Sequence, residues 1–418
     1  MREKIAKTPP MGWNSWDCYG ASVTEKEVRA NAEYMAKNLK DHGWEYVVVD
    51  IQWFEPLADS ADYREGAELV MDRYSRLMPA ENRFPSAANG AGFKPLGDYI
   101  HSLGLKFGIH ILRGIPRQAV RLGTGIYGTD RSAAEIADIG SVCSWNGDMC
   151  GVDMTREGAQ EYYDSIISMY ADWGVDFLKV DDIARPYHKA ETEAIANAIE
   201  KTGREIVLSL SPGEASIAEA EHLAEHANMW RMTDDFWDGW EQLKKMFDYC
   251  RAWFPYVREG AWPDCDMLPL GRIGIRSHGG DRMTNFTHDE QKLMMSLWCI
   301  FRSPLMFGGD MTYNDDLTLS LMRNRELLKM HSSSSAGREV YRKGNEIVWT
   351  ANGEDGTGYL AQFNIGDDEI NSETDLAFLG SAEYGTAEEL WTGDVSEIEN
   401  NRVISKVPPH GVRLFKLS

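Results

Sequence analysis

Two segments of the chain each begin as an apolar strand and end in paired acids: 177–183 (FLKVDDI) and 229–235 (MWRMTDD). Because side chains alternate across a strand, Lys179 and Asp181 share one face of the first, and Arg231 and Asp235 share one face of the second. Buried cations and carboxylates at strand ends are unfavourable unless they pair or serve a ligand. Each segment alone is equally consistent with a structural ion pair.

Two inward carboxyl groups are the minimum that glycoside hydrolysis requires, because one attacks or activates and the other protonates the leaving oxygen. Lys179 should keep Asp181 ionised, as a nucleophile requires. Asp235 precedes Phe236 and Trp237, so we expect desolvation to favour its protonated form, as an acid requires.

Three further strands contribute polar side chains by the same alternation. In 45–53 (EYVVVDIQW), Val47, Val49 and Ile51 are expected to face outward, which turns Asp50 and Gln52 inward. The other residues expected to face inward are His110 in 106–112, and Ser209 and Ser211 in 206–211. Polar groups on five consecutive strands indicate one shared site rather than five coincidences.

Strands that alternate with helices from residue 11 to about 330 predict βαβ units with parallel pairing. About eight units predict a closed (β/α)₈ TIM barrel over 1–331, whose active sites lie at the carboxyl ends of the strands. An open doubly wound sheet is the alternative, but no Gly-rich phosphate turn follows the first strand. The long segment 113–155 is expected to be a loop at the site.

Short alternating strands separated by Gly, Asn and Asp turns predict a small antiparallel β-sandwich domain over 332–418. We expect this domain to cover an apolar flank of the barrel rather than to bind sugar.

The formal charge of −23 argues against nucleic acid or an anionic membrane as a partner. Six scattered cysteines are expected to be thiols, with one pair between Cys143 and Cys150 left open. The first residues contain no apolar signal segment and no run reaches membrane-spanning length, so a cytoplasmic location is expected. The sequence carries no signal for an oligomeric state.

Several motifs, in order, resemble those of glycoside hydrolase family 27, the melibiase family of α-galactosidases and α-N-acetylgalactosaminidases. They are TPPMGWNSWDCYG, VVDIQW, FLKVDD, WRMTDDFWDGW, WPDCDMLPLG and SLWCIFRSPLMFGGD. The resemblance runs from about Thr8 to the end of the chain. It implies a barrel followed by an antiparallel β domain, and retaining hydrolysis of a carbohydrate without a metal or organic cofactor.

By motif position, the resemblance implies that Asp181 is the nucleophile and Asp235 the acid/base. It also implies sugar-binding roles for Trp16, Asp50, Lys179, Arg231 and Asp266. Trp16 would stack on the apolar face of the sugar ring, and Asp50 would accept from hydroxyls. Core packing of Trp16 and a strand-end cap at Asp50 are the structural alternatives.

Two positions depart from the family pattern. The strand that reads galactose usually ends in two acids, and here Ile51 replaces the second, so a sugar without the exocyclic group, such as L-arabinopyranose, is an alternative. Galactose remains open if His110 or Arg113 substitutes for the missing acid. Ser211 stands where the family reads the 2-substituent, and a small residue there resembles the N-acetylgalactosaminidase branch.

The leading hypothesis is therefore a retaining exo-glycosidase acting on terminal α-galactosyl or α-N-acetylgalactosaminyl residues. One alternative is a β-L-arabinopyranosidase, and another is a catalytically silent sugar-binding protein on the same scaffold. A metal-dependent hydrolase using Asp50, His110 and Asp181 is a further alternative that no paired-His motif supports.

Overall fold

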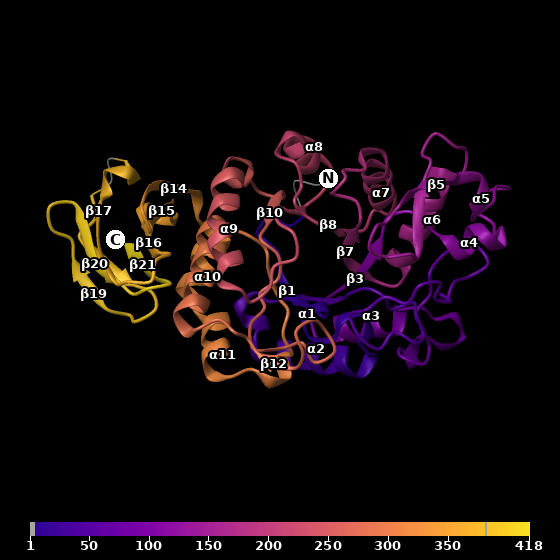
Figure 1. Ribbon diagram of the computed structural model, residues 1–418, viewed down its shortest axis with the longest axis horizontal. Helices are drawn as coiled ribbons and strands as arrows, with labels where there is room; N and C mark the ends of the chain where they lie inside the picture. Colours follow the sequence, from indigo (N-terminus) through magenta and orange to yellow (C-terminus); the bar gives the residue numbers. More distant parts are fainter. Residues whose placement is uncertain (1–4, 381–382) are drawn as a thin grey trace.

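The computed structural model describes residues 5–380 and 383–418 and contains a parallel eight-stranded barrel followed by an antiparallel β-sandwich (Figure 1). The strands lie in the order β10-β9-β8-β7-β3-β2-β1-β13. The barrel closes through Leu268, whose N–H donates to Met306 and whose carbonyl accepts from Gly308. The barrel strands are β1 (Met11–Asn14), β2 (Tyr46–Val49), β3 (Lys106–Leu112), β7 (Val175–Asp181), β8 (Val207–Leu210), β9 (Met229–Arg231), β10 (Trp262–Asp264) and β13 (Leu305–Phe307). The predicted fold class is confirmed.

Helices surround the barrel, as expected for strands whose outward residues are apolar. Thr24 and Glu27 form a capping box at the start of the first long helix. The segment 316–333 forms two helices, because Asn324 ends the first and caps the second. The main helices are α2 (Glu25–Asn38), α3 (Lys94–Ser102), α6 (Ala159–Asp172), α7 (Lys189–Thr202), α8 (Ala220–His226), α9 (Trp240–Trp253), α10 (His288–Phe301), α11 (Asp316–Arg323) and α12 (Arg325–Ser333).

The segment predicted as a long loop, 113–155, folds into a small subdomain. Its three-stranded antiparallel sheet has the order β4-β6-β5, with β4 (Ile115–Pro116), β5 (Ala137–Val142) and β6 (Met149–Val152). Two short helices, α4 (Arg117–Leu122) and α5 (Ala133–Ile136), lie beside it. Cys143 and Cys150 are both free and buried here, so the pair left open by the sequence is not formed.

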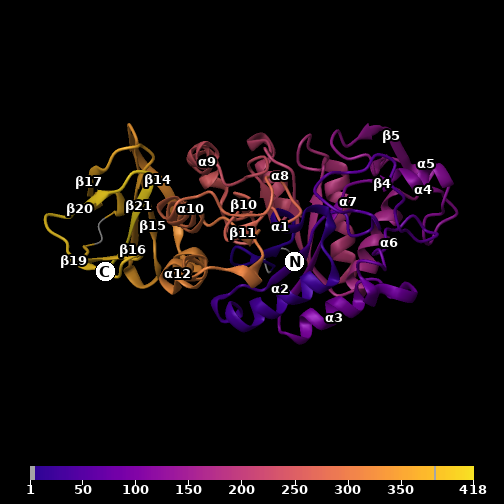
Figure 2. The ribbon, with the colours of Figure 1, turned by 60° about the horizontal axis from the view of Figure 1, so that its bottom comes forward.

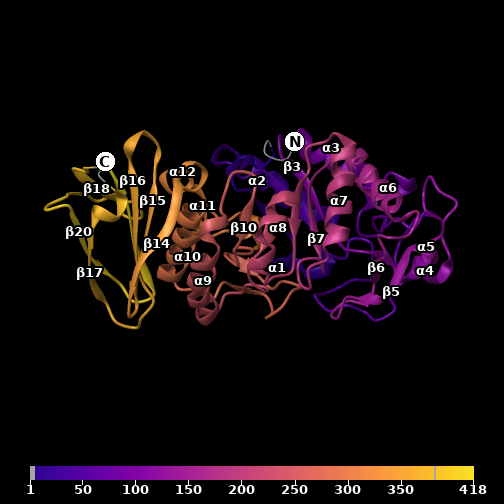
Figure 3. The ribbon, with the colours of Figure 1, turned by 90° about the horizontal axis from the view of Figure 1, so that it is seen from above.

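The C-terminal domain and this subdomain lie at opposite ends of the molecule (Figures 2 and 3). The sandwich has a six-stranded sheet, β14-β15-β16-β21-β18-β19, and a two-stranded sheet, β17-β20. Helices α9 and α10 separate it from the barrel strands, and its ring of Phe363 lies 5.0 Å from Phe247 of α9. Its strands are β14 (Ser335–Lys343), β15 (Glu346–Asn352), β16 (Gly358–Asn364), β17 (Ile370–Asp375), β18 (Thr386–Glu389), β19 (Val395–Glu397), β20 (Arg402–Val407) and β21 (Gly411–Leu417).

No helix among the described residues is both long enough and apolar enough to cross a bilayer.

Candidate active site

A cavity of about 310 Å³ opens where the barrel strands end, within the size range of about 300–1,000 Å³ typical of ligand sites. Both predicted catalytic acids, Asp181 and Asp235, line this cavity. The other lining residues are Trp16, Asp50, Ile51, Tyr63, Trp145, Lys179, Arg185, Pro212, Asp234, Met267 and His278.

A second cavity of about 620 Å³ lies at the other end of the barrel, where Met11, Tyr46 and Lys106 begin their strands. Catalytic groups of barrel enzymes lie at the carboxyl ends, so size does not make this second cavity the better candidate.

Asp181 ends β7 and is held as a carboxylate by three neighbours. His110 of β3 donates from Nε2 to Oδ2 at 3.2 Å, and the backbone N–H of Asp182 donates to Oδ1 at 2.9 Å. Burial alone would raise the pKa of Asp181, but the hydrogen bond and charge of His110, with the charge of Lys179, outweigh it and lower the pKa. Asp181 is therefore ionised at neutral pH, as a nucleophile requires.

Asp50 and Lys179 form a buried pair next to Asp181. Lys179 Nζ donates to Asp50 Oδ2 at 2.8 Å, and Asn14 Nδ2 donates to the same oxygen at 2.7 Å. Burial opposes ionisation of both, but Lys179 lowers the pKa of Asp50, and Asp50 with Asp181 raises that of Lys179. Because Asp50 Oδ1 is bound only by the N–H of Ile51 among the described contacts, it has a further lone pair for a sugar hydroxyl.

Asp235 lies in the turn beyond β9, and its carboxyl group accepts a hydrogen bond from Arg231. Arg231 Nη2 donates to Asp235 Oδ1 at 3.1 Å, while Nη1 lies 2.8 Å from Asp266 Oδ1. The expected desolvation of Asp235 is wrong for this structure, because 56% of its side chain is exposed and Phe236 turns into the core. The Asp235 carboxyl group is therefore held by the guanidinium on one side and open to the cavity on the other.

Asp266 lies one layer deeper than predicted for a sugar-binding residue. With Ser211 and Arg231 it lines a small cavity of about 20 Å³ beneath the main one. Its Oδ2 accepts from the N–H of Phe236 at 2.8 Å. Asp266 thus positions both the Arg231 guanidinium, which binds Asp235, and the turn in which Asp235 lies.

Asp264 is a second buried acid beside Asp266, and its Oδ1 accepts from the N–H of Asp266 at 2.9 Å. Burial, followed by the charge of Asp266, raises the pKa of Asp264 to about 7.

The predicted outward orientation of Ile51 is wrong. Strand β2 ends at Val49, so the alternation of side chains stops before Ile51, which lines the cavity beside Asp50. Gln52, predicted to face the site with Asp50, is not among the residues lining the cavity; it is buried, and its amide donates to Asp148 of the 113–155 subdomain.

Aromatic side chains that the sequence analysis did not assign form one wall of the cavity. Tyr63 stacks on Trp16 with ring centroids 6.1 Å apart and also contacts Trp145, at 5.6 Å. His278 lies edge-on to Trp16 at 5.9 Å and to Trp237 at 5.7 Å. Tyr63 and His278 come from loops without a regular pattern, so only the abundance of aromatics could have suggested them.

Arg113 and His110 were both considered as replacements for the missing galactose-reading acid. Arg113 is buried and pairs with Asp182 and Glu191, each at 3.0 Å. His110 is bound to Asp181 and is not among the residues lining the main cavity. Both side chains therefore have other partners in this structure.

Comparisons with known proteins agree with this arrangement. The sequence matches the family described as alpha galactosidase A over residues 8–156 and 147–332, and the alpha galactosidase C-terminal beta sandwich domain over 343–417. Alpha-galactosidase 2 of Arabidopsis thaliana is 25% identical over 427 residues, covering 100% of this chain and 91% of the relative.

Two proteins of known crystal structure are much more similar. A GH27 β-L-arabinopyranosidase of Geobacillus stearothermophilus is 57% identical with a TM-score of 0.98, over 100% of this chain and 98% of that one. A variant of that enzyme was solved in complex with arabinose. A candidate α-N-acetylgalactosaminidase of Bacillus halodurans is 53% identical with a TM-score of 0.90, over 99% and 98% of the two chains. With both parts of the sequence matched, the chain belongs to glycoside hydrolase family 27, the melibiase family.

Proposed function

We propose that this protein is a retaining β-L-arabinopyranosidase that removes terminal β-L-arabinopyranosyl residues. The observation that carries the proposal is Ile51, an apolar residue that lines the cavity beside Asp50. An apolar wall suits a pyranose without an exocyclic hydroxymethyl group, because a hydroxyl buried there without a partner costs about 1–3 kcal/mol.

The two acids supply both steps of the reaction. The Asp181 carboxylate attacks the anomeric carbon while protonated Asp235 gives its proton to the glycosidic oxygen, so the bond to the aglycone breaks. The Asp235 carboxylate then takes a proton from water, and that water attacks the anomeric carbon and releases Asp181. Two displacements at one carbon retain its configuration.

Asp235 must hold a proton for the first step, which it gives to the glycosidic oxygen. Its side chain is 56% exposed, so a bound glycoside would cover it and bring that oxygen within reach.

The 57% identical arabinopyranosidase supports the same choice of sugar, whereas the matched α-galactosidases are far more distant. The other contacts of Arg113 and His110 also disfavour galactose, since neither stands in for the missing acid. The leading expectation from sequence, an α-galactosyl or α-N-acetylgalactosaminyl substrate, is thus supported less well than its alternative.

A panel of p-nitrophenyl glycosides tests the proposal: β-L-arabinopyranoside, α-D-galactopyranoside and α-N-acetyl-D-galactosaminide. We expect kcat/KM to be highest for the arabinopyranoside, and Asp181→Asn, purified in parallel, controls for contaminating enzymes. A higher kcat/KM for either other sugar would contradict the choice of glycone. Binding of arabinose without release of nitrophenol from any of the three would instead indicate a silent sugar-binding protein.

A further inference from the structure

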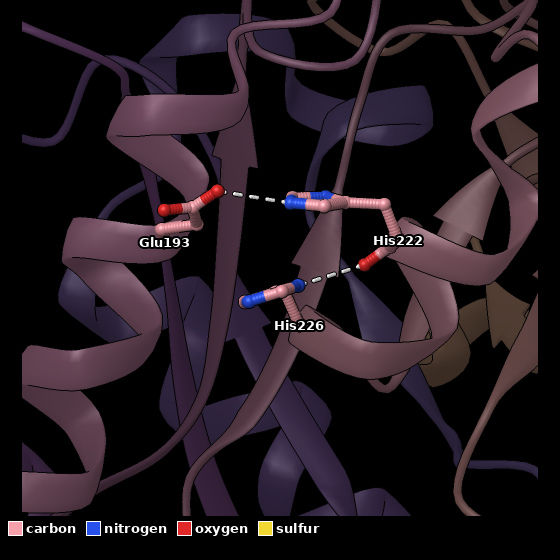
Figure 4. Close-up of side chains that lie close together, drawn as sticks. All are labelled: Glu193, His222 and His226. Atoms are coloured by element: carbon pink, nitrogen blue, oxygen red, sulfur yellow. Dashed lines mark hydrogen bonds and ion pairs between the residues drawn. The ribbon is translucent and has the colours of Figure 1, made fainter.

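Two histidines and a glutamate meet on the outer face of the barrel, away from the catalytic acids. Glu193 comes from α7, and His222 and His226 lie four residues apart on α8, so both rings project from one side of that helix (Figure 4). One ligand atom from each of the three lies within 4.8 Å of the other two. The set Asp50, His110 and Asp181, considered from the sequence, is not such a group among the described residues.

Hydrogen bonds fix which ring nitrogens face the centre of the cluster. His226 Nδ1 donates to the backbone carbonyl of His222 at 3.0 Å, so its Nε2 carries a free lone pair. His222 Nδ1 bonds the hydroxyl of Tyr187 at 2.7 Å, and its Nε2 faces Glu193 Oε1 at 3.0 Å. Metal-bound histidines typically have this pattern, with one nitrogen on the metal and the other held by a neighbouring group.

We propose that Glu193, His222 and His226 form a binding site for a divalent transition ion of the zinc type. Two imidazole nitrogens and one carboxylate oxygen are ligands that Zn²⁺ accepts, with water at a fourth position. Zinc bonds of about 2.0–2.1 Å in tetrahedral geometry place ligand atoms about 3.3 Å apart. The His222–Glu193 pair, at 3.0 Å, lies within about 0.3 Å of this spacing, and the His226 ring is stacked on that of His222 with centroids 4.1 Å apart.

The cluster is accessible to an ion from solution, because 49% of the Glu193 side chain and 21% of the His222 side chain are exposed. An ion here would join α7 to α8. It would also be linked to the loop after β7, because the Tyr187 hydroxyl binds His222 and Tyr187 follows Asp181 by six residues. The site is therefore structural: it positions the loop that leaves the nucleophile and takes no part in the chemistry.

Isothermal titration of chelator-treated, desalted full-length protein with ZnCl₂ tests the proposal. We expect one ion per chain in the wild type and none at this site in His222→Ala/His226→Ala. Glu193→Gln keeps the shape of the side chain and a hydrogen-bond partner for His222, and should weaken binding at least tenfold. Tyr187→Phe should weaken binding about 10–100-fold, as loss of an outer partner typically does. His42→Ala, at the opposite end of the barrel, is the matched control and should bind as the wild type does.

Thermal unfolding gives a second readout that does not depend on glycosidase activity. Zn²⁺ should raise the Tm of the wild type and of His42→Ala, raise that of Glu193→Gln less at the same concentration, and leave that of the double variant unchanged, because an ion that binds only the folded state stabilises it. Equal zinc affinity in the wild type and the double variant, or no stoichiometric binding by the wild type, would overturn the proposal. Neither result would bear on the choice of sugar.

Discussion

Ile51→Asp should shift the enzyme from arabinopyranosides towards galactosides. In the wild type, the exocyclic hydroxyl of a galactoside beside Ile51 would lose water without gaining a partner, at about 1–3 kcal/mol. A carboxylate there can accept that hydroxyl, and hydrogen bonds to charged groups contribute about 1.5–3 kcal/mol. Since about 1.4 kcal/mol is tenfold, the new hydrogen bond alone should raise the ratio of kcat/KM for galactoside over arabinopyranoside about 10–100-fold.

The new acid also has an unfavourable effect. It would stand beside the carboxylates of Asp50 and Asp181 with Lys179 as the nearby cation, so kcat/KM for the arabinopyranoside should fall. Ile51→Val keeps an apolar wall and should leave the ratio unchanged, while Ile51→Asn supplies an acceptor without the charge. The two p-nitrophenyl glycosides give the ratio directly. An unchanged ratio in folded Ile51→Asp that still cleaves the arabinopyranoside would refute the role assigned to Ile51.

Three further changes test the supporting groups. Asp235→Asn should slow glycosides with poor leaving groups far more than activated aryl ones, and equal slowing of both would argue against an acid role. Arg231→Lys cannot bridge Asp235 and Asp266 with one planar fork, so kcat/KM should fall about 100-fold, whereas Arg258→Lys, at the exposed pair with Glu221, should have little effect. Asp264 has a pKa raised from about 4 in the unfolded chain to about 7 in the fold, so it favours the folded state at low pH and this contribution is lost as pH rises towards 7. Asp264→Asn should therefore gain Tm relative to the wild type at pH 8 but not at pH 4, and a parallel offset at both would contradict the assigned pKa.

The barrel was predictable because its strands are apolar runs that alternate with capped helices, and their order follows from parallel pairing. The place of Asp181 at the cavity was predictable for a related reason. Lys179 and Asp181 lie within a strand that the structure retains to its last residue, so alternation places them correctly. Alternation cannot say which acid is the nucleophile and which is the acid/base. That assignment came from the motifs that resemble family 27.

Alternation failed where a strand ended earlier than its apolar sequence. β2 stops at Val49 and β9 at Arg231, so Ile51 and Asp235 are positioned by turns rather than by a sheet. Contacts between segments far apart in the chain also could not be predicted from local sequence patterns. Tyr63 stacks on Trp16, and no periodic pattern in the sequence relates these two positions.

The His222–His226 pair is a different kind of omission. Its four-residue spacing on a helix was present in the sequence, but the third ligand, Glu193, lies on the preceding helix. Only the packing of α7 against α8 brings the three groups together.

The central claim is that Asp181 becomes covalently attached to the sugar during turnover. A 2-deoxy-2-fluoro arabinopyranosyl donor with a good leaving group should inactivate the enzyme by slowing hydrolysis of that intermediate more than its formation. Mass spectrometry of a digest is then predicted to find one fluorosugar on the peptide that contains Asp181, and none in Asp181→Asn. A fluorosugar on a different residue, or rapid turnover of the donor with inversion at the anomeric carbon, would contradict the account.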